Sequence, residues 1–228
     1  MYKDKTFLAI IPARGGSKRL PRKNILNLNG KPLIAWSIEA GLKSKYIDKV
    51  VVTSDCDEIL NISKEYGADI IKRPSELAKD TSSSFIAIKH TVDNFKEYDY
   101  IILLQPTSPL RDERDIDESI EFLANRDAVI SVCETDHSPL WANTLDESKS
   151  LKGFLKDEIL NKRSQDIKPY YRLNGAIYIC KANKLLEEET FFIKDNIYAY
   201  QMDRKSSIDI DEEIDLKMAE LILNERVS

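Results

Sequence analysis

Short apolar runs alternate with amphipathic segments along the first part of the chain. The apolar runs are rich in aliphatic and β-branched residues, as expected of strands that are buried on both faces of a parallel sheet. The predicted strands cover residues 7–12, 49–55, 68–72, 100–104 and 128–133. Between them, apolar residues recur at helical spacing, and the sets predicted to face the core are Ile34, Ile38 and Leu42; Ile59, Ile62 and Tyr66; Phe85, Ile88 and Val92; and Ile116, Ile120 and Leu123. This alternation predicts an α/β fold, a Rossmann-like, mostly parallel twisted sheet with helices on both faces.

The alternation stops at residues 135–169, which are polar, contain Trp141 and show no clean amphipathic repeat. A connection of this length is uncommon inside a compact domain unless it carries a function. We interpret 135–169 as an inserted segment of a single domain that spans residues 1–228, and as an arm that reaches a second subunit. Strands are predicted again at 170–179 and 197–202, and a closing helix is predicted to face the core with Ile214, Met218, Leu221 and Ile222.

A glycine pair and a group of cations follow the first predicted strand. Glycines allow backbone amides to approach a ligand without a Cβ in the way, and successive amides in a turn form an anion-binding nest. The glycines are Gly15 and Gly16, and the cations are Arg14, Lys18, Arg19, Arg22 and Lys23. The segment lacks the Gly-Lys-Ser/Thr ending of a P-loop and the third glycine of the dinucleotide fingerprint. It indicates a polyphosphate site of another kind, with a basic surface loop as the alternative.

Two aspartates, Asp209 and Asp211, lie two residues apart near the end of the chain. In extended backbone such residues point to the same side, where two carboxylates are costly without a cation between them. Mg²⁺ suits this position because it takes few protein carboxylates and completes its shell with phosphate oxygens and water. The alternative is that one aspartate caps the next helix and the other is solvated. Together with a phosphate-binding loop, the pair indicates a metal–nucleotide site.

Composition limits the classes of function. With 34 basic and 39 acidic residues, the chain has a net charge of −5, which argues against a general nucleic-acid-binding protein. No apolar run approaches the length of a membrane span, and residues 1–5 are too charged for a signal peptide. Cys56, Cys133 and Cys180 are predicted to be free thiols, the last two packed in strands. These features favour a cytoplasmic protein without membrane or nucleic-acid partners.

Several sequence blocks resemble the CMP–sialic acid synthetases (N-acylneuraminate cytidylyltransferases). They are residues 10–25, 73–80 (RPSELAKD), 104–111 (LQPTSPLR), 174–178 (NGAIY) and 207–211 (SIDID). The blocks follow the order of that family, so the resemblance covers nearly the whole chain. It implies a nucleotidyltransferase fold that is similar to the glycosyltransferase-A fold. It also implies a homodimer built through the inserted segment, which would cap the substrate.

The resemblance implies a reaction between CTP and a nonulosonic acid, a nine-carbon 2-keto acid sugar of the sialic type. The anomeric hydroxyl of the sugar would attack the α-phosphorus of CTP and release pyrophosphate, with Mg²⁺ as cofactor. Such transfers depend mainly on positioning and on neutralising charge around phosphorus. Asp209, or a water held by the metal, would accept the proton of the sugar.

The same resemblance implies the roles of individual residues. The catalytic residues are Arg14, Lys23, Asp209 and Asp211, with Lys23 at the α-phosphate and the two aspartates as Mg²⁺ ligands. The CTP-binding residues are Ala13, Arg14, Gly15, Ser17, Lys18, Lys23, Asn24, Arg73, Ser82 and Ser84, the last three matching cytosine-reading positions. The residues for the sugar acid are Gln105, Arg163, Arg172, Asn174, Tyr178, Phe191 and Phe192, of which the two phenylalanines match a pair that reaches the pocket of the partner subunit.

One departure from the family leaves the sugar open. After Ser138-Pro139-Leu140, where some members carry a lysine for the sugar, this chain has Trp141. An aromatic residue there suits a less hydroxylated, more acylated acid such as legionaminic acid. The alternatives are therefore N-acylneuraminic, legionaminic, pseudaminic or keto-deoxy-octonic acid and, outside the enzymes, a catalytically silent nucleotide-binding relative.

Overall fold

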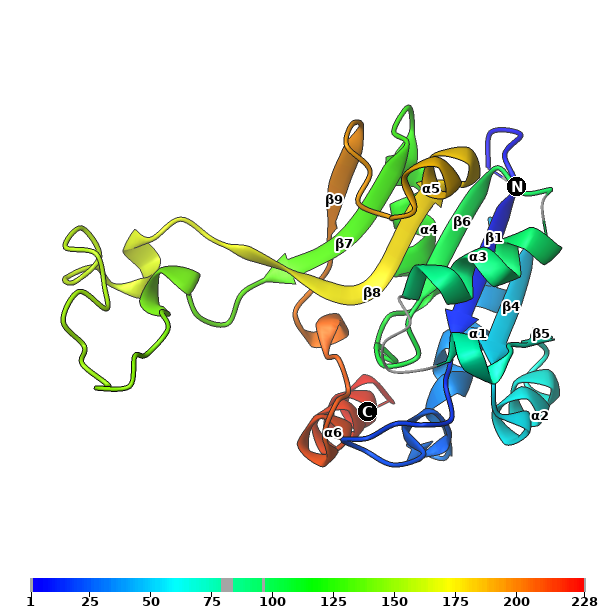
Figure 1. Ribbon diagram of the computed structural model, residues 1–228, viewed down its shortest axis with the longest axis horizontal. Coiled ribbons are helices and arrows are strands. Elements are labelled where there is room, and N and C mark those ends of the chain that lie inside the picture. The colour runs from blue at the N-terminus through cyan, green and yellow to red at the C-terminus, as the bar shows by residue number, and fades with distance from the viewer. Residues whose placement is uncertain (1, 79–83, 96, 228) are drawn as a thin grey trace.

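A computed structural model describes residues 2–78, 84–95 and 97–227. All the predicted strands are present, within two residues of their predicted bounds. They are β1 (Phe7–Pro12), β4 (Lys49–Ser54), β5 (Asp69–Lys72), β6 (Tyr100–Leu104), β7 (Ala128–Glu134), β8 (Tyr171–Lys181) and β9 (Ile197–Gln201). They form one seven-stranded sheet in the order β5-β4-β1-β6-β8-β7-β9 (Figure 1). A separate small hairpin consists of β2 (Asn27–Leu28) and β3 (Lys31–Pro32).

The sheet is mixed because one strand runs against the others. β4 pairs in parallel with β1 and β5, and β1 pairs in parallel with β6, as predicted. β8 lies between β6 and β7 and is antiparallel to both, whereas β9 is parallel to β7. Antiparallel neighbours need no helical crossover, and the arm between β7 and β8 simply turns the chain back. The prediction of a mostly parallel α/β sheet is confirmed, with β8 as the exception.

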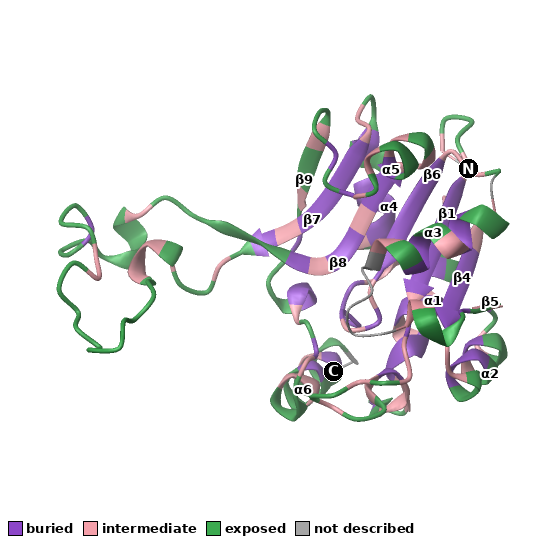
Figure 2. Ribbon diagram, viewed as in Figure 1, coloured by how far each residue is buried: buried purple, intermediate pink, exposed green. Residues whose placement is uncertain are grey.

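Helices cover both faces of the sheet. They are α1 (Leu33–Lys43), α2 (Asp57–Glu65), α3 (Ser84–Asn94), α4 (Glu113–Leu123), α5 (Ala182–Glu188) and α6 (Glu213–Val227). In β1, Phe7, Ala9 and Ile11 pack in the core cluster that contains residues of α1, α2 and α4. Leu8 and Ile10 pack in the opposite cluster with residues of α3 and α5. Figure 2 shows the central strands buried between these layers.

The last helix packs differently from its prediction. Ile214, Met218 and Leu221 were expected to face the core, and this is wrong, since 59%, 50% and 62% of their surfaces are exposed. Leu223 is buried instead, because α6 packs on the small hairpin and the start of α1 in a third cluster, not on the sheet. Leu42, near the end of α1, is also exposed and not in the core.

Residues 135–169 form an arm that projects from the sheet where β7 and β8 meet (Figure 1). The arm contains two short 3-10 helices, Pro139–Trp141 and Ser164–Asp166. Its residues are mostly exposed (Figure 2), and Ile159 is buried. A segment with so little buried apolar surface gains little stability from its own packing.

The cysteine predictions are also met. Cys56, Cys133 and Cys180 are free, and the last two are buried in β7 and β8. Among the residues that the structure describes, no helix is both long enough and apolar enough to cross a bilayer.

Asp115 makes the stability of the fold depend on pH. Its carboxylate accepts a hydrogen bond from the Asp112 N–H at 3.1 Å and closes the capping box at the start of α4. Burial raises the pKa of Asp115 from 3.8 to about 6. Because the folded state holds this proton more tightly than the unfolded state, the stabilisation is fully present below pH 3.8 and is lost as the pH rises through about 6.

We expect Asp115→Asn to remove this dependence. The amide keeps an acceptor for the Asp112 N–H but does not ionise. The free energy of unfolding of the variant, relative to wild type, should therefore rise by about 1–3 kcal/mol between about pH 4 and about pH 7. Urea denaturation at both pH values measures this, with the exposed Asp157→Asn as control. A difference that stays constant with pH would contradict the assignment.

Candidate active site

The cationic loop after β1 contacts the acidic segment before α6, far away in the sequence. Lys23 Nζ donates to Asp211 Oδ1 at 2.9 Å and to the Ile210 carbonyl at 2.7 Å. Arg19 Nη1 donates to Asp211 Oδ2 at 2.6 Å, so each carboxylate oxygen of Asp211 faces a cation. In Figure 1 the dark blue loop runs to α6. The loop that the sequence singles out for polyphosphate is thus in direct contact with the segment that it singles out for metal.

Contacts with β4 and the residue after it fix the start of the loop. Ala13 N donates to the Thr53 carbonyl at 3.0 Å, which continues the pairing of β1 with β4. Gly15 N donates to Asp55 Oδ1 at 3.0 Å. Ser17 N then donates to the Gly15 carbonyl at 3.1 Å, in a tight turn. One amide of the glycine pair therefore already binds an anionic oxygen of the protein.

A second set of contacts places Lys23. Asn24 is buried, and its side-chain amide donates to the Arg14 carbonyl at 3.0 Å. Both Lys23 and Asn24 lie on a 3-10 turn, Lys23–Ile25. This hydrogen bond holds the 3-10 turn next to the glycine pair, and it thereby fixes the position of Lys23. Arg14 is partly buried and Lys18 is exposed on the same loop.

Asp209 and Asp211 have different electrostatic environments. The hydrogen bond from Lys23, together with its charge, lowers the pKa of Asp211. The pKa of Asp209 is raised chiefly because neighbouring protein atoms remove part of the water around its carboxylate, although the residue is still exposed. The negative charge of Asp211 raises this pKa further. A hydrogen bond from the Thr107 side chain partly offsets the rise. The Ile210 N–H, between the two aspartates, donates to the Thr107 carbonyl at 2.7 Å.

Arg73 follows β5 and is 5% exposed. Its guanidinium lies 3.9 Å from the Asp55 carboxylate, and its Nε has no hydrogen-bond partner among the described residues. Burial lowers the pKa of Arg73, and the charge of Arg14 contributes to the decrease. Of the other predicted base-reading residues, Ser84 begins α3 and Ser82 lies outside the described residues.

Tyr178 of β8 faces the acidic segment from the sheet. Burial raises the pKa of Tyr178, and the charge of Asp209 raises it further. Its ring packs edge-on against Phe191 and Phe192, with centroid distances of 5.9 and 6.2 Å. Phe191 is 8% exposed and belongs to the core of its own chain, whereas Phe192 is 51% exposed. The expectation that both rings reach a partner subunit is corrected for Phe191, because its own chain already covers it.

Gln105 and Arg172 flank the same region. Gln105 follows β6 and lies beside Gly175, where a Cβ would meet Gln105 Oε1 at 3.1 Å. Gly175 has a φ of +76°, which favours glycine. Arg172 Nη2 donates to the Ser207 carbonyl at 3.2 Å. Arg172 therefore contacts the segment that carries the two aspartates, and Gln105 lies beside the same strand, β8.

Two predicted sugar contacts do not lie on this surface. Arg163 is exposed in the arm, which projects away from the sheet (Figure 1). Asn174 is 1% exposed, and its side-chain amide is bonded to the hydroxyls of Ser131 and Ser207 at 2.6 and 2.9 Å. Within one chain, the first residue is remote from the site and the second lies beneath it.

Asp55, Thr107 and Ser207 belong to the site although the sequence pattern does not single them out. Asp55 could have been found, because it follows a predicted parallel strand and ligands meet the carboxyl ends of such strands. Thr107 and Ser207 lie in the sequence blocks quoted above, but they act through a carbonyl and a buried hydroxyl, which the residue types alone do not indicate.

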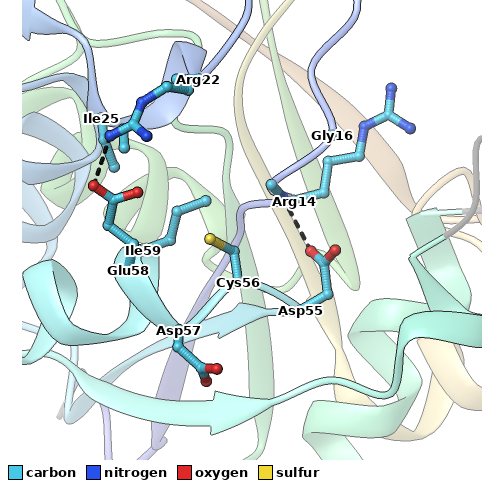
Figure 3. A pocket seen from close by; sticks show the side chains of 10 residues that line it. Arg14, Gly16, Arg22, Ile25, Asp55, Cys56, Asp57, Glu58 and Ile59 are labelled. Atoms are coloured by element: carbon cyan, nitrogen blue, oxygen red, sulfur yellow. Dashed lines mark hydrogen bonds and ion pairs between the residues drawn. The ribbon is translucent and has the colours of Figure 1, made fainter.

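A cavity of about 530 Å³ lies on the α2 side of the glycine pair (Figure 3). Figure 3 shows the Arg22–Glu58 ion pair and the bond from Gly15 to Asp55 on opposite sides of Cys56. The lining is Arg14, Gly15, Gly16, Arg22, Ile25, Asp55, Cys56, Asp57, Glu58 and Ile59. Its carboxylates outnumber its arginines, which is unfavourable for a polyphosphate. The opposite side of the loop, beside Lys23, is the better candidate.

Comparison with known proteins agrees with these motifs. The sequence model of a family described as Cytidylyltransferase matches residues 8–226. An N-acylneuraminate cytidylyltransferase of Escherichia coli O18:K1:H7 is 40% identical over 93% of the chain, which spans only 51% of that protein. A CMP-N,N'-diacetyllegionaminic acid synthase of Legionella pneumophila is 35% identical, with 95% of both chains covered. The solved structure of CMP:2-keto-3-deoxy-manno-octonic acid synthetase complexed with CTP has a similar fold, with a TM-score of 0.74 at 17% identity over 97% of this chain and 99% of that one.

The two glycines of the loop should respond differently to substitution. A Cβ on Gly15 would lie 3.0 Å from Cys56 Cβ, whereas a Cβ on Gly16 would meet nothing within 4 Å. We expect Gly15→Ala to lower the free energy of unfolding by about 1–3 kcal/mol through overpacking, and Gly16→Ala to change it by less than about 0.5 kcal/mol. Urea denaturation of both variants measures this. Equal effects would show that the loop is not packed against α2 as described.

Proposed function

The chain belongs to the cytidylyltransferase family, and within it we propose that the chain transfers CMP from CTP to a nonulosonic acid. The anomeric oxygen of the sugar forms a bond to the α-phosphorus, the bond from that phosphorus to the bridging oxygen breaks, and pyrophosphate leaves. The sequence matches to an N-acylneuraminate cytidylyltransferase and to a legionaminic acid synthase support this class of sugar. Because the chain spans about half of the first of these relatives, the proposal concerns this domain alone.

The observation that carries the proposal is the contact between Lys23 and Asp211. A phosphate-binding loop alone would be compatible with many nucleotide-binding proteins. Its direct contact with Asp211, one of the two aspartates, supports a site that has cations on one side and metal-type ligands on the other. This is what transfer of a phosphoryl group requires, because charge must be neutralised around phosphorus and on the leaving group.

Mg²⁺ fits the residues that are present. The donor set is Asp209 and Asp211, two hard carboxylates, and the raised pKa of Asp209 marks a carboxylate that lacks a direct cationic partner among the described residues. The described part of the chain contains no group of three or more His, Cys, Asp or Glu side chains placed so that they could hold a metal ion. A metal ion at the pair would therefore take phosphate oxygens and water as its other ligands, as Mg²⁺ commonly does. Bound there, it would neutralise charge on the triphosphate.

The chain's own residues then have distinct tasks. We assign Arg14, Ser17 and Lys18 to the triphosphate and Lys23 to the α-phosphate, with Asn24 at the nucleotide. Ala13 and Gly15 contribute backbone to the loop, and Arg73, Ser82 and Ser84 are assigned to the base. The Nε of the buried Arg73 has no partner within the described parts of the chain, which supports its assignment, since a buried donor left unbonded is costly and a ligand would satisfy it.

The sugar and a second subunit meet on the other side of the site. Gln105, Arg172 and Tyr178 are assigned to the sugar acid. We propose that the arm, residues 135–169, forms a homodimer and brings Arg163 to the partner's site. The exposed Phe192 and the apolar residues on the arm, Leu145, Leu151 and Leu160 at 57%, 67% and 57% exposure, support a partner that covers them.

The identity of the sugar and the alternative of a silent relative are tested together. Pyrophosphate release from CTP and Mg²⁺ should be measured with a panel of N-acylneuraminic, legionaminic, pseudaminic and keto-deoxy-octonic acids. Release with one nonulosonic acid identifies the substrate, and Trp141 favours legionaminic acid. No release with any of them would leave a nucleotide-binding protein without this activity.

Asp211→Asn should lower turnover by roughly 10²-fold or more, because it removes charge that stabilises the transition state. The assay is pyrophosphate release at saturating CTP and Mg²⁺. The matched control is Glu212→Gln, which neutralises the exposed neighbouring carboxylate and should leave turnover unchanged. Full turnover by Asp211→Asn would exclude the metal assignment.

Lys23→Ala should depress kcat more than it weakens CTP binding, because the proposed role of Lys23 lies in the transition state. Steady-state kinetics and CTP calorimetry on the same variant separate the two effects. Arg22→Met is the control, since that cation of the same loop pairs with Glu58. If kcat stayed constant and only CTP affinity fell, Lys23 would be a docking residue.

A further inference from the structure

β8 bends at a bulge, and a buried hydroxyl fills the break in its pairing with β7. The register shifts between Ile130 and Val132 of β7, so that Ser131 lies opposite the extra residues 174–177 of β8. The Ser131 hydroxyl is 1% exposed and accepts a hydrogen bond from the Ile177 N–H at 2.8 Å. A broken ladder in a buried sheet leaves backbone groups unpaired unless a side chain satisfies them. Ser131 does so here.

The Asn174 side chain connects this bulge to the segment before the aspartates. Its Oδ1 accepts from the Ser131 hydroxyl at 2.6 Å and from the Ala176 N–H at 3.2 Å. Its Nδ2 donates to Ser207 Oγ at 2.9 Å and to Met202 Sδ at 3.2 Å. Both ends of the amide are therefore directed into the protein, and Asn174 has no group left for a sugar.

Ser207 connects this hydrogen-bond network to the segment that carries Asp209 and Asp211. It is fully buried, and its hydroxyl donates to the Asp203 carbonyl at 2.7 Å. Two residues later comes Asp209, and the Ile210 N–H is held by the Thr107 carbonyl at 2.7 Å. The segment 207–211 is thus held from the sheet, from the loop after β6 and, through the Asp211 carboxylate, from the cationic loop.

We propose that Ser131, Asn174 and Ser207 form a relay that positions Asp209 and Asp211 for a divalent cation and the nucleotide. Apolar packing alone would stabilise this region without fixing one geometry, whereas hydrogen bonds in a buried network fix direction as well as distance. Asn174 is then a positioning residue and does not contact the sugar. The functional part of this inference rests on the proposed function, but the relay itself rests on the contacts alone.

Hydrogen exchange tests the relay without any ligand. In Ser207→Ala, the Ile210 amide should exchange about 10-fold faster than in wild type, because the segment loses its side-chain bond to Asn174 of the sheet. The control is Ser119→Ala, which removes another fully buried hydroxyl whose bond, to the Ile116 carbonyl at 2.7 Å, stays within α4. The control should leave the Ile210 amide unchanged. Unchanged exchange in Ser207→Ala would overturn the relay.

Metal binding tests the positioning role. With CTP present, Mn²⁺ affinity measured by electron paramagnetic resonance should fall about 10-fold in Ser207→Ala, while CTP affinity in EDTA stays at the wild-type value. Unchanged Mn²⁺ affinity, or an equal loss of CTP affinity in EDTA, would overturn the positioning role. Failure of the wild-type protein to bind Mn²⁺ with CTP would count against the proposed function instead, and the exchange result decides the relay independently.

Discussion

The Lys23 ammonium holds the first loop of the chain against its last acidic segment. The contact joins residues 188 positions apart, and the Lys23 side chain is only 11% exposed. A largely buried ammonium is stable only when its donors are used, and the Asp211 carboxylate and the Ile210 carbonyl use them. The positions of three segments therefore depend on one another: the glycine pair, the 3-10 turn that carries Lys23, and the segment before α6.

The antiparallel direction of β8 explains how the residues proposed for the sugar acid come near the contact between Lys23 and Asp211. In the register of β6 and β8, Leu104 pairs with Ile177, so the carboxyl end of β6 lies beside the middle of β8 and residues 171–176 extend beyond it. Arg172 and Tyr178 thereby reach the edge of the sheet where β1, β4 and β6 end. Had β8 been parallel to β6, Arg172, at the start of the strand, would lie at the opposite edge. Because β7 is also antiparallel to β8, the arm leaves from the same edge as the site.

The sequence predicts structural features that follow from the local pattern of residues. It does not predict features that depend on which other part of the chain packs against a segment. Strands appear as apolar runs and helices as periodic ones, so their bounds were predictable, but periodicity carries no information about the direction of β8. The exposed face of α6, with Ile214, Met218 and Leu221, was mispredicted because the buried face of a helix is set by what covers it. A motif match likewise marked Asn174 without distinguishing ligand contact from support beneath the site. The family resemblance assigned Lys23 and Asp211 to one reaction, so their proximity could be expected, whereas the bond from Arg19 to Asp211 could not.

Two features of the site are unfavourable in the chain as it stands. The buried Arg73 has an Nε without a partner among the described residues, and the pKa of Asp209 is raised by the loss of solvent and by the charge of Asp211. Groups of this kind lower the stability of the fold. The hydrogen bonds of Lys23 and of the Asn174 amide, which lie nearby, offset this loss. Under the proposed function, the Arg73 donor would serve the base and the Asp209 carboxylate would serve a metal ion. Hydrogen-bonded neighbours thus hold in place two groups that are unfavourable for the stability of the chain alone.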